Sequence, residues 1–203
     1  MPIISISGPS LTGKSSLHRE LLSATQGNSS VWFHRNFHES VWEELVSQKV
    51  FSEFDELQND TEYLCIYLFR IISRFEEFFS KNYDDKLIIL DGCWLDTLIY
   101  ASLNMWYNSF LRELQEEIFT KISSFHESVD RIYLTSAFDD VYPPQLKGNR
   151  KFVSNFKKNR SLEIKSYELA GKLQGIKKLP SSSIEESVQF ILSDLKDSGY
   201  MNS

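Results

Sequence analysis

The stretch Gly8-Pro9-Ser10-Leu11-Thr12-Gly13-Lys14-Ser15 decides the fold of this chain. It fits the spacing G-x-x-x-x-G-K-[ST] without a mismatch, and it directly follows the apolar run Ile3-Ile4-Ser5-Ile6. In such a loop the backbone N–H groups surround a polyphosphate, and the positive end of the next helix dipole points at the same oxygens. We therefore predict a phosphate-binding loop in which residues Gly8 to Ser16 hold the phosphates of a nucleotide.

Both flanks of this loop agree with the prediction. Residues 2–7 form a short β-branched run typical of a strand, and three leucines give helical spacing from Lys14 to about Ala24. The alternative is an ordinary glycine-rich turn that matches the pattern by chance. The agreement of both flanks favours the phosphate loop, in which Lys14 would supply a mobile charge and Ser15 would hold Mg²⁺.

Length and composition indicate one globular domain over residues 1–203. Hydrophobic residues make up 41% and charged residues 25%, the balance of a soluble folded protein. The chain has no apolar run that could span a bilayer and no secretory signal pattern, so we expect no membrane partner and a cytoplasmic location, or the host cytoplasm if the protein is viral. Cys65 and Cys93 lack metal-ligand spacing and are expected to be buried thiols.

Charge is distributed unevenly along the chain. Residues 147–178 contain ten Lys or Arg against two Glu, a net charge of +8, whereas the net charge of the whole chain is -6. A basic insert on an acidic body indicates a local anionic partner. We expect a lid at about residues 139–160 that closes over phosphates and excludes water, with Arg150 as its catalytic member.

Apolar runs alternate with helical patterns along the rest of the chain. The clearest strand is 86–91, a continuous apolar run that ends in Asp91, and the clearest helix covers about 61–81. This alternation predicts an α/β fold with a five-stranded parallel sheet and helices on both faces. Further strands are expected at 31–35, 131–135 and 175–180, and further helices around 42–50, from Asp96, at about 110–125, from about 161, and after a cap at Ser181 or Ser183.

The predicted topology gathers distant residues at one edge of the sheet. Ligands of such sheets bind at the carboxyl ends of the strands, where the phosphate loop, Arg35, Asp91 and the segment after Thr135 would meet. Phosphoryl transfer requires a donor cradle, a metal ion, positive charge along the transfer path and exclusion of water. We expect Lys14 and Asp91 to be catalytic, and Ser15 and Asp91 to hold Mg²⁺ directly or through water.

Several of these residues have a structural alternative. Asp91 would either bind metal or cap the turn after its strand. Arg70 would either reach an acceptor or lie as a charge on a helix edge, and Arg35 has the same two alternatives. Phe37 would form either core or a wall for base stacking. The sequence gives His34 and His38 no partner pattern, so both are expected to be structural or surface residues.

The order of these parts resembles the thymidylate kinase family nearly from end to end. The stretch Leu64–Arg70 resembles the helix whose arginine contacts the base, and Leu90-Asp91 stands where the family has a strand ending in Asp-Arg-Tyr. Arg35 lies near the arginine of the Arg-Glu-Pro-Gly turn, and Tyr100 has the spacing of the Ala-Tyr-Gln segment. The resemblance implies the P-loop NTPase fold, ATP and Mg²⁺ as donor, a deoxynucleotide acceptor contacted by Arg35, Phe37, Arg70 and Tyr100, and a homodimer as a further expectation.

The departures from the family lie on the acceptor side. Ser10 replaces an acidic residue that touches the sugar hydroxyl, Gly92 and Cys93 replace the arginine and tyrosine of Asp-Arg-Tyr, and Asn36-Phe37 replaces Glu-Pro. A bound monophosphate would then have to be neutralised by Arg35, Arg70 or the lid. The donor side of the family pattern is intact.

These observations leave several functions open. The first is a divergent kinase, of which a viral enzyme would be one example, that phosphorylates a thymidylate-like or modified deoxynucleoside monophosphate. The second is a kinase of a hydroxymethylated base within DNA, and a deoxynucleoside kinase lies between the two. A non-catalytic nucleotide switch is the alternative from another class, although the chain has no Asn-Lys-x-Asp guanine-reading motif. Assay of turnover with a panel of acceptors separates these classes.

Overall fold

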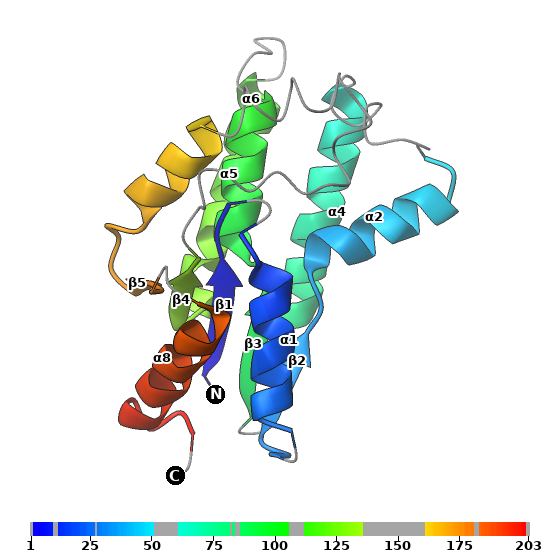
Figure 1. Ribbon diagram of the computed structural model, residues 1–203. Coiled ribbons are helices and arrows are strands. Elements are labelled where there is room, and N and C mark those ends of the chain that lie inside the picture. Colours follow the sequence, from blue (N-terminus) through cyan, green and yellow to red (C-terminus); the bar gives the residue numbers. More distant parts are fainter. Residues whose placement is uncertain are drawn as a thin grey trace, which may run out of the picture.

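Five parallel strands form the centre of the protein. Figure 1 shows this arrangement in a computed structural model. The order across the sheet is β2-β3-β1-β4-β5, and every neighbouring pair is parallel. The predicted five-stranded parallel sheet is therefore confirmed. The strands are β1 (Ile3–Ser7), β2 (Val31–His34), β3 (Leu87–Asp91), β4 (Arg131–Leu134) and β5 (Ile176–Lys178).

The structure describes residues 2–9, 12–26, 28–50, 61–81, 83, 86–105, 112–135, 161–180 and 183–201. The predicted lid at 139–160, including Arg150, lies outside these residues. Ser10 and Leu11 of the phosphate loop also lie outside them.

Helices cover both faces of the sheet, as predicted. On one face α1 (Lys14–Ala24) and α8 (Ile184–Asp197) lie side by side in Figure 1 and enclose the smaller of the two apolar clusters. The helices that enclose the larger cluster on the other face are α2 (Phe37–Ser47), α4 (Thr61–Phe79), α5 (Trp94–Met105), α6 (Arg112–Ser123) with the 3₁₀ turn η2 (Ser124–Ser128), and the helix at residues 161–170. No helix in the described part of the chain has the length and apolar character needed to cross a membrane.

The two faces follow from the alternation of side chains along the strands. All five residues of β1 and all five of β3 are buried, as expected for central strands covered on both sides. Ile4, Ile6 and Ile89 pack toward α1 and α8, whereas Ile88 and Leu90 belong to the other cluster. Burying each of these side chains contributes roughly 1.5–3 kcal/mol.

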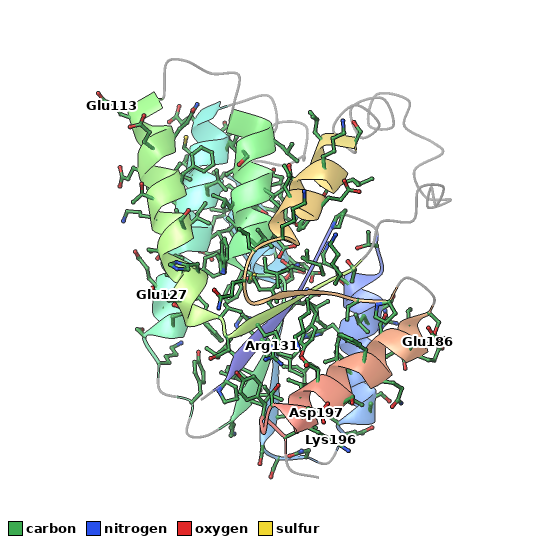
Figure 2. All side chains as sticks on the ribbon, turned by 90° about the vertical axis from the view of Figure 1, so that its left-hand side faces the viewer. Glu113, Glu127, Arg131, Glu186, Lys196 and Asp197 are labelled. Carbon is green, nitrogen blue, oxygen red and sulfur yellow. The ribbon has the colours of Figure 1, made fainter. Side chains whose placement is uncertain are left out.

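The last helix is fixed to the sheet through one carboxylate. Arg131, labelled at the start of β4 in Figure 2, donates a hydrogen bond of 2.6 Å to Asp194 of α8. The hydroxyl of Tyr133 donates to the same carboxylate at 2.6 Å, and Lys177 of β5 forms an ion pair with it. The pKa of Asp194 is lowered because these donors outweigh the opposing effect of burial. Ser183 caps the helix by accepting from the N–H of Glu186, which confirms one of the two predicted caps.

Some element boundaries differ from the sequence prediction. Helix α5 begins at Trp94, two residues before Asp96, because Asp96 occupies the third helical position and its carboxylate accepts from the N–H of Cys93 at 2.9 Å. Asp96 therefore caps the start of α5 from within the first turn of the helix. This position also points its carboxylate back toward the carboxyl ends of the strands.

Candidate functional site

The phosphate loop joins β1 to α1, as predicted. Gly8 has a φ of 148° and Gly13 a φ of 82°, values that side chains rarely adopt. Gly13 is the N-cap of α1, so the helix N-terminus faces the loop. The ammonium of Lys14 lies over the loop and donates hydrogen bonds to the carbonyl oxygens of Gly8 at 2.7 Å and Pro9 at 2.9 Å.

The loop packs closely on the end of β4. A Cβ atom on Gly8 would lie 2.1 Å from Oγ1 of Thr135, so only glycine allows this approach. Thr12 completes the contact, because its hydroxyl lies 2.5 Å from that of Thr135 and donates to the carbonyl of Pro9 at 2.8 Å. The loop backbone is therefore held in place by a neighbouring strand.

A hydroxyl and a carboxylate meet beside the loop. Ser15 at the start of α1 donates a hydrogen bond of 3.1 Å to Oδ2 of Asp91, the last residue of β3. The other carboxylate oxygen, Oδ1, is buried and has no hydrogen-bond partner among the residues that the structure describes. Burial raises the pKa of Asp91, while His18, Ser15 and Lys14 act in the opposite direction. The sequence prediction that Ser15 and Asp91 lie together agrees with this geometry.

This pair fits Mg²⁺ bound together with phosphates. Mg²⁺ usually takes one or two protein oxygens and completes its coordination with water and substrate phosphates. Oδ1 of Asp91, which no described residue contacts by a hydrogen bond, and the hydroxyl oxygen of Ser15 are ligands of the kind that Mg²⁺ takes. Within the described ranges, no group of three or more His, Cys, Asp or Glu side chains could hold a metal ion by itself.

A pocket opens next to the loop. It shares Gly8 and Lys14 with the loop, so it lies directly beside the expected position of the donor phosphates. The remaining lining comes from the segment after β2, from α5 and from the helix at 161–170: Asn36, His38, Asp96, Ile99, Tyr100, Leu103, Glu163 and Tyr167.

Asp96 connects the parts of the pocket. Its carboxylate accepts hydrogen bonds from the hydroxyl of Ser7 at 2.6 Å and from that of Tyr167 at 2.7 Å. It also accepts from the N–H groups of Gly8 at 3.3 Å and Cys93 at 2.9 Å. One side chain therefore ties the loop and the start of α5 to the helix at 161–170.

His38 forms part of the pocket wall and is neutral at pH 7. Its ring nitrogens lie 2.9 Å from the hydroxyl of Tyr67 and 2.9 Å from that of Thr97. Burial lowers the pKa of His38 to about 4, with a further lowering by Lys14 that Asp96 opposes. Its ring centroid is 5.6 Å from that of Tyr100, so the two rings form one aromatic side of the pocket.

Among the residues predicted to bind the acceptor, Tyr100 lines the pocket and three others lie elsewhere. Arg35 is exposed and pairs with Glu39 at 3.1 Å and Glu43 at 2.9 Å, which raises its pKa. Phe37 is 4% exposed and packs against Phe75 and Phe78 in the core.

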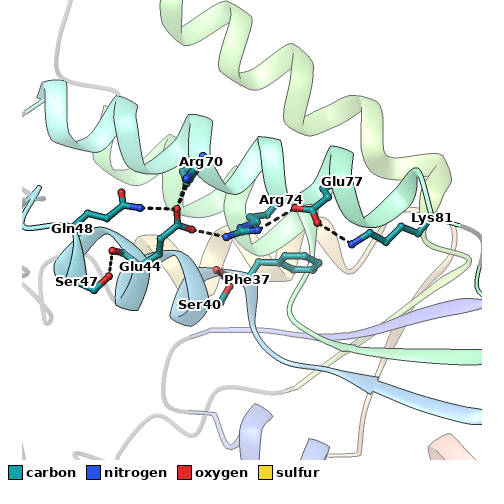
Figure 3. A network of polar contacts seen from close by, with 9 residues as sticks. All are labelled: Phe37, Ser40, Glu44, Ser47, Gln48, Arg70, Arg74, Glu77 and Lys81. Carbon is teal, nitrogen blue, oxygen red and sulfur yellow. Dashed lines mark hydrogen bonds and ion pairs between the residues drawn. The ribbon is translucent and has the colours of Figure 1, made fainter.

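Arg70 belongs to a chain of charged side chains between α2 and α4, drawn in Figure 3. Arg70 and Arg74 both pair with the carboxylate of Glu44, to which Arg74 donates a hydrogen bond of 2.7 Å. Arg74 also pairs with Glu77, which in turn pairs with Lys81. A contact of Arg35, Phe37 or Arg70 with an acceptor remains a prediction from the sequence.

The sequence analysis missed seven lining residues of this pocket, the apolar Ile99 and Leu103 and five polar ones. Asn36, His38 and Asp96 lie within a few residues of the carboxyl ends of β2 and β3, and that proximity is a usable sequence signal. Glu163 and Tyr167 come from a helix whose position relative to the sheet depends on the tertiary packing. Their role had no comparable signal in the sequence.

Comparison with known proteins reveals a shared fold. No protein-family model and no curated protein matches the chain. Among solved structures, thymidylate kinase from Candida albicans matches with a TM-score of 0.60 and 13% identity, over 100% of this chain and 95% of that one. NadR in complex with NAD and AMP-PNP matches with a TM-score of 0.61 and 14% identity, and NadR in complex with NR with 0.64 and 16%.

The extent of these matches limits what they establish. The chain spans 51% and 53% of the two NadR chains, all of its own length being covered in each case. The identities are low, so the likeness concerns the fold. The chain has the thymidylate kinase-like P-loop fold, and the fold expected from the resemblance is thereby confirmed.

Proposed function

We propose that this protein is an ATP-dependent kinase that transfers the γ-phosphoryl group to a small molecule of the nucleoside or nucleotide class. One observation carries the proposal: the phosphate loop and the adjoining pocket share Gly8 and Lys14. A phosphate held by the loop would therefore face a molecule held in the pocket. Proximity and orientation of this kind supply much of the catalysis of phosphoryl transfer.

The residues of the chain have distinct roles in this proposal. The loop amides and Lys14 would bind the donor phosphates, and Ser15 with Asp91 would hold Mg²⁺. When bound, Mg²⁺ neutralises charge on the phosphate oxygens. Asp96 would hold the loop and the helix at 161–170 in place around the acceptor, because its carboxylate accepts hydrogen bonds from Gly8 and from Tyr167.

The bonds change in one displacement. An acceptor oxygen forms a bond to the γ-phosphorus, and the bond between that phosphorus and the oxygen bridging to the β-phosphate breaks. ADP leaves with the electron pair of the broken bond. Where the acceptor oxygen is a hydroxyl, its proton passes to a pocket carboxylate and then to water, whereas an ionised phosphate oxygen has no proton to lose.

The acceptor candidates are those that the sequence suggested. The structural likeness to thymidylate kinase supports a small nucleotide or nucleoside, and a hydroxymethylated base in DNA is tested beside it. The segment at 139–160, with Arg150, is proposed to act as the lid of a single domain, and a homodimer is proposed from the same resemblance. These three proposals depend on the kinase assignment.

Transfer of label from γ-labelled ATP tests the function. The protein is incubated with ATP and Mg²⁺ against deoxynucleosides, deoxynucleoside monophosphates and base-modified DNA. We expect label in a small-molecule product and its loss in Lys14→Ala, because the loop then lacks its mobile charge. Lys196→Ala is the matched control, since Lys196 is exposed on α8 (Figure 2). Failure to label any acceptor, or full transfer by Lys14→Ala, would contradict the proposal.

A further inference from the structure

The carboxylate of Asp96 lies between the phosphate loop and the helix at 161–170, and its two oxygens have different partners. Oδ2 accepts hydrogen bonds from the hydroxyl of Ser7 at 2.6 Å and from the N–H of Cys93 at 2.9 Å. Oδ1 accepts from the N–H of Gly8 at 3.3 Å and from the hydroxyl of Tyr167 at 2.7 Å. A carboxylate has about four acceptor positions, so the protein itself fills those of Asp96. This side chain is therefore suited to hold other groups in place rather than to bind a ligand.

The N–H of Gly8 belongs to the first peptide group of the phosphate loop. Asp96 accepts from this N–H, and the ammonium of Lys14 donates to the carbonyl oxygen of the same residue at 2.7 Å. The peptide groups on both sides of Gly8 are thus each held by a charged side chain. The directions of the N–H groups in such a loop decide how well they surround a phosphate. The contact between Asp96 and Gly8 therefore bears on the binding of the donor.

Tyr167 reaches this carboxylate from the helix at 161–170. Among residues 161–170, all of which the structure describes, only Tyr167 and Ala170 are buried. Burial raises the pKa of Tyr167 well above its usual value, so its hydroxyl keeps its proton at neutral pH and donates it to Oδ1 of Asp96. One carboxylate oxygen is therefore shared by the phosphate loop and this helix.

We infer that Tyr167 is a positioning residue of the donor site, which fixes the start of the phosphate loop through Asp96 and thereby strengthens the binding of ATP. This inference rests on the proposed kinase function and concerns the donor side of the same site. Without the hydroxyl, the described contacts of Oδ1 reduce to the long hydrogen bond from Gly8, which holds the carboxylate less firmly. The negative charge of Asp96 would also be less well balanced close to the donor phosphates. Both effects weaken the binding of ATP.

A second tyrosine provides a matched control. The hydroxyl of Tyr133 on β4 donates to the carboxylate of Asp194 at 2.6 Å, and Tyr133 is buried like Tyr167. Asp194 lies on α8, and Tyr133 is not part of the described lining of the pocket. Tyr133→Phe therefore removes the same kind of hydrogen bond from another part of the fold. Both variants should lower Tm, whereas only Tyr167→Phe should change the binding of ATP.

The test measures the binding of a non-hydrolysable ATP analogue with Mg²⁺ by titration calorimetry, well below the Tm of each protein. We expect the dissociation constant to rise about five- to tenfold in Tyr167→Phe and to stay within about twofold of the parent value in Tyr133→Phe. Steady-state kinetics of Tyr167→Phe should show a similar rise in KM for ATP, with a smaller change in kcat.

Hydrogen exchange of the parent protein gives a measurement that needs no variant. If the contact of Tyr167 with Asp96 strengthens the binding of ATP, then bound ATP must strengthen that contact by the same factor. Saturation with the ATP analogue should therefore slow amide exchange at residues 161–170. In Tyr167→Phe this protection should be smaller.

The outcomes separate the inference from the function on which it depends. Failure of the parent protein to bind the ATP analogue would overturn both. Binding by the parent protein with an unchanged dissociation constant in Tyr167→Phe would overturn the inference and leave the kinase function intact. An equal loss of affinity in Tyr133→Phe would also overturn the inference, because general destabilisation would then explain the effect. Unchanged exchange at residues 161–170 in the saturated parent protein would overturn it as well.

Discussion

Asp91 is the residue on which the proposed metal site and the proposed transfer geometry both depend. Its Oδ2 accepts from Ser15, and its buried Oδ1 has no hydrogen-bond partner in the described part of the chain. We predict that Asp91→Asn lowers kcat by roughly 100-fold or more, because the amide replaces a negatively charged oxygen donor. The measurement is steady-state kinetics over a series of Mg²⁺ concentrations. A change in kcat of only twofold would indicate that Asp91 merely caps the end of its strand.

Gly8 illustrates how a single atom constrains the loop. We predict that Gly8→Ala destabilises the protein by about 1–3 kcal/mol, because the new Cβ would meet Oγ1 of Thr135 at 2.1 Å. Chemical denaturation of both proteins measures the difference. The double variant with Thr135→Ala should recover part of the loss, since the closest of the clashing atoms is removed. Unchanged stability in Gly8→Ala would show that the loop does not pack on β4 in this way.

The buried side chain of His38 should make the stability of the protein depend on pH. Its pKa is lowered from 6.5 to about 4 by burial, so the unfolded chain binds a proton at a higher pH than the folded protein does. Stability should therefore fall as the pH drops from 6.5 toward 4, by at most roughly 3 kcal/mol. Denaturation across this range is the measurement.

Two variants identify the source of that dependence. His38→Gln should make the profile shallower, because glutamine takes up no proton in this range. Part of the slope should remain, since burial also lowers the pKa of His34. His126→Gln should retain the slope, since His126 is exposed on η2. A steep profile in His38→Gln would assign the dependence to other groups.

At the scale of elements, α2 and α4 are joined by the charged chain of Figure 3. The Glu44 side chain is 15% exposed, and hydrogen bonds from Arg70 and Arg74 hold its pKa below the ordinary value. We predict that Glu44→Gln lowers the free energy of unfolding by about 0.5–1 kcal/mol at pH 7, because two guanidinium groups then lack their shared carboxylate. The loss should disappear in acid, once Glu44 of the parent protein is protonated.

The control for this prediction is a glutamate with no part in the chain of charges. Glu20 is exposed on α1, and Glu20→Gln should leave stability nearly unchanged. A deficit for Glu44→Gln that is equally large in acid would point to packing rather than charge as its cause.

Most of the elements could be predicted because their signals are local. The apolar run at 86–91 gives β3, and the loop motif with its leucines gives α1, with the bounds observed for that helix. The side-chain partners were harder to predict. Arg35 lies at a strand end where a ligand contact is plausible, yet Glu39 and Glu43 on the next helix turns lie close enough to pair with it. A nearby carboxylate is therefore the signal that the sequence analysis left unused.

Phe37 and Asp96 show the same distinction between local and tertiary information. The spacing of apolar residues could not decide whether Phe37 forms core or a stacking wall, and packing against α4 places it in the core. Asp96 was predicted from its type and position to cap a helix, and it does contact the helix start. Its contacts with Ser7, Gly8 and Tyr167 depend on segments that only the tertiary fold brings together.

For the whole molecule, the uneven charge along the chain leads to a prediction about the lid. We expect the combined neutralisation of Lys147, Arg150 and Lys151 to reduce the transfer rate more than it reduces Tm, because charges exposed to water contribute little to stability. Kinetics and thermal unfolding of the same variant are compared. An equal proportional loss of activity and Tm would argue against a lid.

Adjacency of a donor loop and an acceptor pocket at one edge of the sheet is the central claim of this account. Phosphorus NMR of the protein with ATP and Mg²⁺, run separately with deoxynucleosides and with deoxynucleoside monophosphates, tests it most directly. The account predicts a new phosphorus signal on one of these acceptors that grows in step with ADP. Formation of ADP and inorganic phosphate alone, at a rate indifferent to the acceptor, would contradict it.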